Sequence, residues 1–136
     1  MNLEELGRRA VACPRWRWMP GMMLQWKPEN GSHYRGRVCD TWSFVNEGAL
    51  YCEGHEDRFT REELKAAWPD LSDPATLGCL VALVEEAWKC PIDMSFAGAC
   101  RFDVDAEERV YPQDHTVSFA AKTRVEALVA ALEAAP

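Results

Sequence analysis

The stretch DPATLGCLVALVEEAW, residues 73–88, is the strongest helix signal in the chain. Asp73 is placed to cap the first turn, and Pro74 follows at a helical position that tolerates proline. Leucines, valines and alanines then recur every three or four residues as far as Trp88, so one side of the helix is apolar. We expect that apolar side to pack against a sheet formed by the other segments of the chain.

Three further helices are predicted around this one. Asn2 is placed to cap a helix that runs to about Ala12. Capping boxes of the form T-x-x-E begin at Thr60 and at Thr123. The first predicts a short helix that ends near Trp68, and the second predicts the last helix of the chain.

Alternation of apolar and polar residues predicts strands in most of the remaining segments. The clearest pair is a hairpin that turns at Asn46-Glu47-Gly48, and residues 28–36 are rich in turn formers and predict a loop. The predicted strands span residues 15–18, 38–45, 49–53, 94–104 and 117–121.

The order of elements predicts a single domain, residues 1–136, of the α+β class. Paired strands with one apolar face, separated by amphipathic helices, are typical of a mostly antiparallel sheet covered by helices. We favour an α/β/α sandwich, in which the two long helices cover opposite faces of the sheet. A two-layer α/β fold results if both helices cover the same face.

Composition indicates a globular protein, since 48% of residues are hydrophobic and 27% are charged. No apolar run approaches the ~20 residues of a membrane span, and the N-terminus lacks the apolar segment of a signal peptide. We therefore expect a cytoplasmic protein without membrane contact, its six cysteines present as free thiols. The net charge of -7 disfavours a nucleic-acid partner, although it leaves room for a positive strip on an acidic body.

His33, Cys39, Cys52 and His55 form the most specific candidate for a metal site. Cys52 and His55 make a C-x-x-H step of the kind that zinc modules place on a turn. However, His33 and Cys39 are spaced more widely than in a standard zinc knuckle, and the two cysteines fit equally well as a facing pair or as core residues of the hairpin. Zinc is therefore an alternative rather than the expected cofactor, and no other cofactor is predicted.

An acidic segment follows the predicted strand 94–104. Asp103 and Asp105 are of the residue type that holds magnesium in hydrolases and nucleases. A solvated acidic turn is the favoured interpretation, because no suitably spaced lysine completes a nuclease site. The chain contains no glycine-rich phosphate loop, G-x-S-x-G or H-E-x-x-H motif, so we predict no catalytic residues and favour a protein that is not an enzyme.

The segment CPRWRWMPGM, residues 13–22, raises the question of a binding surface. In an extended chain, Trp16 and Trp18 share one face while Arg15 and Arg17 share the other. Aromatic residues at strand spacing usually belong to the core, so we expect buried indoles and exposed guanidinium groups. Arg15 and Arg17 remain the candidate binding residues.

Three segments resemble a group of small, uncharacterised proteins encoded by phages and prophages of GC-rich bacteria. They are LGRRAVACPRWRWMPGM (residues 6–22), PDLSDPATLGCLVALVEEAW (69–88) and RVEALVAALEAAP (124–136). The order of elements is also similar to that of the phage α/β/α-sandwich domain. The resemblance implies an accessory phage gene expressed in the bacterial cytoplasm, and it carries over no functional residues.

In that setting we favour a non-enzymatic binding or regulatory protein whose partner is a host or phage protein. One form of this hypothesis is an inhibitor of a host defence system, because an acidic face can occupy the nucleic-acid groove of a host complex. The first alternative is a zinc-stabilised small module at Cys39, Cys52 and His55. The second is a metal-dependent hydrolase or nuclease at Asp103 and Asp105.

Overall fold

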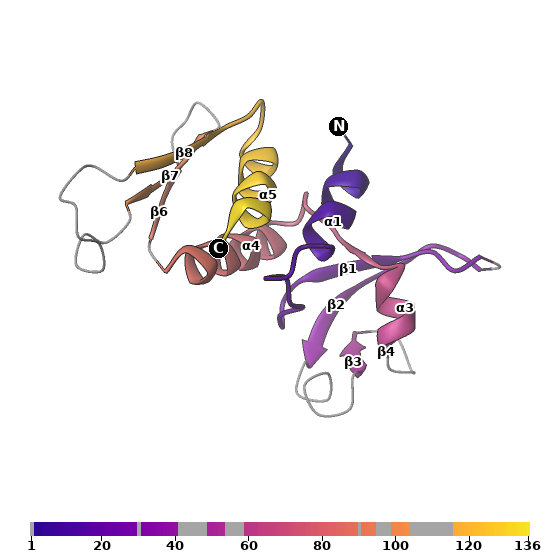
Figure 1. The fold of residues 1–136 in the computed structure, drawn as a ribbon. Helices are drawn as coiled ribbons and strands as arrows, with labels where there is room; N and C mark the ends of the chain where they lie inside the picture. Colours follow the sequence, from indigo (N-terminus) through magenta and orange to yellow (C-terminus); the bar gives the residue numbers. More distant parts are fainter. Residues whose placement is uncertain are drawn as a thin grey trace.

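The computed structural model of the chain describes residues 2–29, 31–40, 49–53, 59–89, 91–94, 99–103 and 116–136. These residues form helices and two sheets, which confirms the predicted α+β class. All strand pairs among them are antiparallel. Figure 1 shows α4 (Pro74–Trp88) and α5 (Arg124–Ala134) in the middle of the molecule, between the two sheets.

The larger sheet contains five strands in the order β4-β3-β2-β1-β5. The strands are Phe59–Thr60 (β4), Ala49–Cys52 (β3), Tyr34–Asp40 (β2), Met23–Trp26 (β1) and Trp68–Pro69 (β5). Helix α1 (Leu3–Val11) packs along β5, and the short helix α3 (Arg61–Lys65) follows β4 directly. The loop between β1 and β2 projects at the right of Figure 1.

The smaller sheet has the order β6-β7-β8, formed by Ile92–Met94, Ala99–Asp103 and Thr116–Ala120. Helix α5 packs on β7 and β8 and also contacts α4 and α1. The indole Nε1 of Trp88 donates to the carbonyl of Ala131 at 2.9 Å, and the guanidinium of Arg9 donates twice to Glu133 at 2.6 and 2.7 Å. Through these contacts, α5 joins the smaller sheet to the helices beside the larger one.

Each helix begins at the cap that the sequence predicted. Asn2 and Thr123 accept hydrogen bonds from backbone N–H groups three residues ahead, and Thr60 forms a full capping box with Glu63. Asp73 caps α4 by accepting from the N–H of Thr76 at 2.9 Å. A side-chain acceptor at this position satisfies a backbone donor that the helix itself cannot pair.

One apolar core runs through the described residues. The ring of Phe59 is fully buried, and the ring of Trp26 meets it edge-on with centroids 5.3 Å apart. The core continues from the larger sheet into the helices through residues that are at most 2% exposed: Leu6, Leu24, Val38, Leu50, Leu80, Leu128 and Leu132. The core therefore packs the larger sheet against helices α1, α4 and α5.

Two glycines allow close approaches that set the shape of the larger sheet. A Cβ on Gly36 would lie 1.9 Å from the hydroxyl oxygen of Tyr34, which reaches across to donate to the carbonyl of Glu53 at 2.8 Å. A Cβ on Gly7 would lie 2.9 Å from the carbonyl oxygen of Pro69, so glycine lets α1 lie directly against β5.

The prediction of a strand over residues 15–18 is wrong, because this segment is a turn followed by irregular chain. The backbone N–H groups of Cys13 and Trp16 bond to carbonyls three residues back, which continues the end of α1 as turns. The predicted exposure is nevertheless confirmed for Trp18, which is 5% exposed, and for both arginines, which face solvent. Trp16 is only half-buried.

Two other predictions are wrong about where strands lie. The predicted loop 28–36 contains the start of β2 at Tyr34, and β1 was not predicted at all. The predicted helix end at Trp68 is instead strand β5, since α3 ends at Lys65. Strands as short as β1 and β5 carry too few alternating residues to be recognised locally.

The predicted single strand 94–104 is a strand pair. Met94 of β6 faces Cys100 of β7, so the chain reverses between them. Alternation with a period of two continues through such a reversal, which is why it cannot distinguish one strand from two. The predicted hairpin of β2 with β3 is confirmed by the pairing of Val38 with Cys52, while its turn at residues 46–48 lies outside the described residues.

Among the described residues, no helix combines the length and the apolar character needed to cross a membrane.

Candidate functional site

The β1–β2 hairpin presents two chemically different faces. Residues that oppose each other across a strand pair share a face, so Leu24, Trp26 and Tyr34 lie together on the core side. The opposite side, which we call the polar face, carries Met23 and Gln25 of β1, Arg37 and Arg35 of β2 and, opposite Gln25, Trp68 of β5. Strand alternation therefore gathers polar groups from three strands on one surface.

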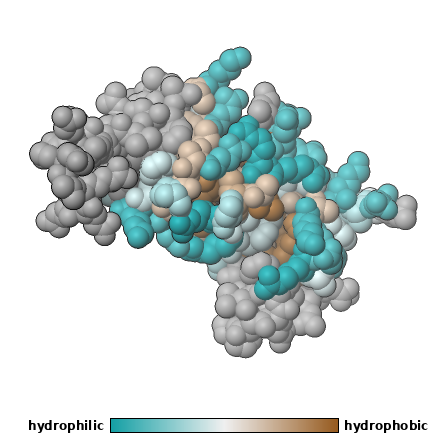
Figure 2. Space-filling model, in the orientation of Figure 1, coloured by the Kyte–Doolittle hydropathy of each residue, from teal (hydrophilic) through white to brown (hydrophobic). Residues whose placement is uncertain are grey.

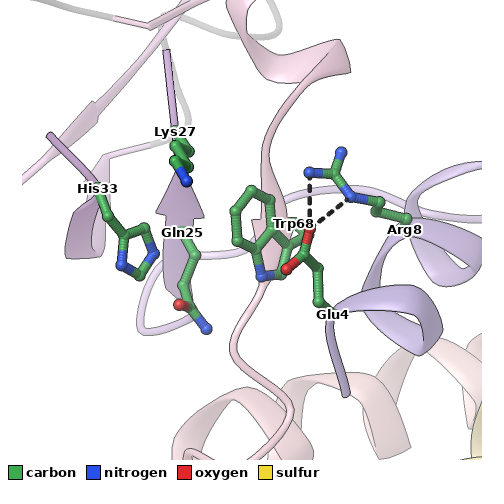
Figure 3. Close-up of a pocket in the computed structure, with 6 residues that line it drawn as sticks. All are labelled: Glu4, Arg8, Gln25, Lys27, His33 and Trp68. Carbon is green, nitrogen blue, oxygen red and sulfur yellow. Dashed lines mark hydrogen bonds and ion pairs between the residues drawn. The ribbon is translucent and has the colours of Figure 1, made fainter. Parts of the chain in front are cut away.

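A pocket of about 460 Å³ opens where the polar face meets α1 (Figure 3). Its volume lies within the range of small-ligand sites in proteins. Helix α1 supplies one wall, and the other wall is the hairpin with the residues just beyond it. We call it the Trp68 pocket, and it is lined by Glu4, Arg8, Gln25, Lys27, His33 and Trp68.

Trp68 is held from both sides of this pocket and is only 5% exposed. The guanidinium carbon of Arg8 lies 4.4 Å from the indole centroid, a cation–π distance. The imidazole of His33 is parallel to the indole within 4°, with centroids 5.8 Å apart. Figure 3 shows Arg8 and His33 on opposite sides of Trp68, with Arg8 anchored by Glu4 at 3.0 Å. The indole is therefore a fixed floor.

Three polar side chains of the pocket make no hydrogen bond with any described residue. They are the amide of Gln25, the ammonium of Lys27 and the imidazole of His33. Lys27 and His33 are exposed, and Gln25 is half-buried. Because Glu4 offsets the charge of Arg8, the charge of Lys27 leaves the pocket positive on a chain of net charge -7.

At the other end of the polar face, the arginines are neutralised by two buried aspartates. Arg37 donates to both carboxylate oxygens of Asp73, at 3.0 and 3.1 Å, and to the carbonyl of Gly21 at 2.6 Å. Arg35 donates to Asp70 at 2.8 Å. Both aspartates are less than a tenth exposed, so these pairs fasten the hairpin to the start of α4.

The pKa of both aspartates lies below its ordinary value. The hydrogen bonds from Arg37, followed by those from Thr76, hold the pKa of Asp73 far below the usual range against the opposing effect of burial. Burial alone would raise the pKa of Asp70, but the hydrogen bonds from Ser72 and Arg35 outweigh it. Both carboxyl groups are therefore ionised at neutral pH, as an ion-pair network requires.

A second hollow of about 280 Å³ lies between the segment after α1 and helix α3. The rings of Trp16 and Trp18 meet edge-on there, with centroids 5.5 Å apart. The indole N–H of Trp16 is buried and has no acceptor among the described residues. We call this hollow the Trp16 groove, and it is lined by Val11, Trp16, Arg17, Trp18, Arg61, Leu64 and Lys65.

The two arginines predicted as binding residues both make contacts within the chain. Arg15 donates to the backbone carbonyl oxygen of Pro136, with its Nε at 2.9 Å. Arg17 forms an ion pair with Glu86 of α4 at 2.6 Å, with both side chains about half exposed. Arg17 lines the Trp16 groove, whereas Arg15 lines neither hollow.

The predicted zinc site lies only partly within the described residues, so it stays a prediction. His33 faces Trp68, whereas Cys52 is buried beside Tyr34, and His55 lies outside the described residues. Burial, followed by the charge of Cys39, raises the pKa of Cys52 to about 12, so its thiol stays protonated at neutral pH. Exposed Cys39 donates to the carbonyl of Tyr51 at 3.3 Å. Within the described ranges, no three histidine, cysteine or acidic side chains are grouped as metal ligands.

The predicted acidic metal site is not described at the level of side chains. The backbone of Asp103 ends β7, where it pairs with Thr116 of β8. Asp105 lies outside the described residues. The hydrolase or nuclease hypothesis therefore stays untested.

Comparison of the chain with protein-family models, with curated proteins and with solved structures found no match. No residue role is therefore transferred from another protein. The function is therefore inferred from the geometry of the Trp68 pocket and the Trp16 groove.

Sequence reasoning missed most of the Trp68 pocket. The alternation of Gln25 with Lys27 was a usable signal, because it places both side chains on one face of an extended chain. No local pattern connects them to Trp68, which lies about 40 residues further along the sequence. His33 was singled out as a metal ligand, and its place in a pocket with an aromatic floor follows only from the strand register.

Proposed function

We propose that this chain is a non-enzymatic binding protein that engages an anionic partner through the Trp68 pocket. The observation that carries the proposal is the set of polar side chains without a described partner, Gln25, Lys27 and His33, beside a fixed indole. Hydrogen-bonding groups gathered in a concave site over an aromatic floor are typical of ligand recognition.

The charge of the pocket indicates the chemistry of the partner. Lys27 can only donate hydrogen bonds, and the amide of Gln25 adds two more N–H donors. A partner that presents carboxylate or other anionic oxygens satisfies these donors with charge-assisted hydrogen bonds, which are stronger than neutral ones. The acidic remainder of the chain repels non-specific anions, so binding is confined to this part of the surface.

The lining of the pocket favours recognition over catalysis. None of its six residues carries a hydroxyl or thiol nucleophile, and the carboxylate of Glu4 is already bonded to Arg8. His33 makes no hydrogen bond with a described carboxylate that would orient it, as the third member of a catalytic triad orients the histidine base.

We further propose that the partner is a host or phage protein and that the chain acts as a phage accessory protein, for example as an inhibitor of a host defence system. This part of the proposal is supported by the resemblance of residues 6–22, 69–88 and 124–136 to small phage and prophage proteins. An acidic inhibitor with a positive recognition pocket can both occupy a nucleic-acid groove and hold an acidic side chain beside it.

The proposal is tested by capturing partners from a bacterial lysate on the immobilised full chain and on the variant Lys27→Glu. A protein that binds the unmodified chain and is lost with Lys27→Glu supports the pocket as the binding site. The matched control is Lys122→Glu, which makes the same charge change at an exposed lysine outside the pocket. Equal capture by all three proteins would refute the proposed role of the pocket. The zinc content of the same preparations tests the zinc alternative.

A further inference from the structure

The Trp68 pocket and the Trp16 groove adjoin along one side of α1. Glu4 and Arg8 line the pocket, and Val11 lines the groove. Residues spaced by four and then three positions lie on the same side of a helix. The chain opposite α1 also passes from one hollow to the other, since Lys65 lines the groove and Trp68 lines the pocket. The two hollows therefore form one track.

A direct contact lies at the junction of the two hollows. The Nη1 of Arg8 lies 3.4 Å from the carbonyl oxygen of Ala66, which is located between Lys65 and Trp68. Figure 2 shows hydrophobic residues among hydrophilic ones near the middle of this face of the molecule. The lining residues give the track apolar groups at Val11, Leu64 and the indoles, with charged groups beside them, and this arrangement resembles the core and rim of a protein interface.

The track is positive although the chain is acidic. The described residues that line it include the basic residues Arg8, Arg17, Lys27 and Lys65, and Glu4 is the acidic residue among them. The ion pairs of Arg17 with Glu86 and of Lys65 with Glu62 join side chains that are about half exposed or more. Exposed pairs of this kind contribute little to stability, so a ligand carboxylate can replace the internal partner.

The Trp16 groove differs from the pocket because it can accept an apolar group. Val11, Leu64 and the two indoles form its walls. These walls suit an apolar side chain of a ligand, because packing it there removes apolar surface from water. The indole N–H of Trp16, which has no acceptor among the described residues, is too deeply buried for a ligand to reach.

The separation of the hollows sets the spacing of groups in the ligand. Along α1, seven residues from Glu4 to Val11 rise by about 10 Å, at ~1.5 Å per residue. An extended peptide spans about 10 Å in roughly three residues, at ~3.3 Å each. An acidic residue in the pocket and an apolar residue in the groove are therefore separated by about three positions in the bound segment.

We infer that the track binds an extended acidic segment of the partner protein, in which a carboxylate enters the Trp68 pocket and an apolar side chain three positions away enters the Trp16 groove. This inference rests on the proposed binding function of the Trp68 pocket and adds the groove, the peptide character and the spacing. Single-stranded nucleic acid fits less well, because Trp68 and Trp18 are each 5% exposed and only the half-buried Trp16 offers part of a ring for base stacking.

The inference is tested by selecting random displayed peptides on the immobilised full chain. We expect enriched sequences that combine an acidic residue with a large apolar residue three positions away, flanked by further acidic residues. A synthetic copy of an enriched peptide is then titrated by fluorescence anisotropy against the unmodified chain and its variants. Neutral or basic enriched sequences, or no enrichment, would overturn the inference.

Variants separate the two hollows. We expect Lys27→Glu in the pocket and Lys65→Glu in the groove each to weaken the peptide by about tenfold or more, the effect of reversing one charge at a contact. Lys65→Arg keeps the charge and should bind normally, and Lys122→Glu outside the track should change affinity less than about twofold. Circular dichroism of each variant verifies that it is folded.

The outcomes distinguish this inference from the function on which it rests. A peptide that responds to Lys27→Glu but not to Lys65→Glu overturns the role of the groove and leaves the pocket as a binding site. A peptide that responds to neither variant, together with capture that ignores Lys27→Glu, overturns both. Tighter binding of a labelled oligothymidylate than of the peptide, with the same response to both variants, assigns the track to nucleic acid and overturns the peptide.

Discussion

The two ends of the polar face of the β1–β2 hairpin both carry basic side chains, but these are paired with carboxylates at one end only. At one end, which we call the paired end, Arg35 and Arg37 bond to Asp70 and Asp73, and those carboxylates are almost fully buried. At the other, the open end, Lys27 and His33 bond to no described acceptor. The same alternation of a strand pair thus produces a structural network at one end and an available surface at the other.

The difference shows that a basic residue is not evidence of a binding site until its partners are known. The guanidinium of Arg37 is well suited to bind an anion, but its N–H groups already donate to Asp73 and to the carbonyl of Gly21. Lys27, which the sequence did not single out, makes no hydrogen bond or ion pair with any described residue. Four substitutions and one pH profile test this difference between the two ends.

The largest effect is expected for Asp73→Ala at the paired end. This change removes the cap of α4 and the partner of Arg37, and it leaves the hydroxyl of Thr76 without its acceptor. We expect the free energy of unfolding, measured by urea denaturation, to fall by about 2–4 kcal/mol. Asp73→Asn, which retains a capping oxygen, should lose less. A loss below about 0.5 kcal/mol for Asp73→Ala would show that the network does not hold the hairpin to α4.

The pH dependence of stability should follow from the same residues. The pKa of Asp73 and of Asp70 is lower in the folded state than in the unfolded state, where an aspartate has a pKa of about 3.9. Their contribution is therefore fully present above about pH 5 and is lost as the pH falls below about 4. The stability difference between the unmodified chain and Asp73→Asn should be constant from pH 5 to 8 and shrink in acid. A difference independent of pH down to about pH 3 would contradict the ionised pair.

A smaller effect is expected for Arg35→Ala. Arg35 is half exposed, and Asp70 keeps both hydrogen bonds from Ser72 when the guanidinium is removed. We expect a loss of about 0.5–1 kcal/mol in the same denaturation experiment. A loss as large as that of Asp73→Ala would show that the ion pairs, rather than the helix cap, dominate the paired end.

The smallest effect on stability is expected for Lys27→Ala at the open end. The ammonium has no described partner, so its removal should change the free energy of unfolding by less than about 0.5 kcal/mol. Partner capture should nevertheless fall clearly, in the same direction as for Lys27→Glu. A destabilised Lys27→Ala variant would mean that this end of the face is structural as well, and the contrast between the ends would be lost.

Local features of the fold were predictable from the sequence. The caps at Asn2, Thr60, Asp73 and Thr123 were read correctly, because each depends on a side chain and a backbone N–H only three residues apart. The α+β class followed from the alternation of helical and strand periods. The burial of Trp18 was also predicted correctly, although the strand from which it was inferred does not form.

The tertiary structure alone determined which polar groups remain available. The sequence shows Arg17, Lys27, Arg35 and Arg37 as equivalent basic residues, and nothing near them in the chain marks which will be paired. The pairing of β1 with β2 and β5, and the docking of α4 by its N-terminus, bring Asp70 and Asp73 to two of them. Hydrogen bonds within one helical turn can be predicted from residues three positions apart. Whether a basic side chain is paired depends on carboxylates tens of residues away, which only folding brings into contact with it.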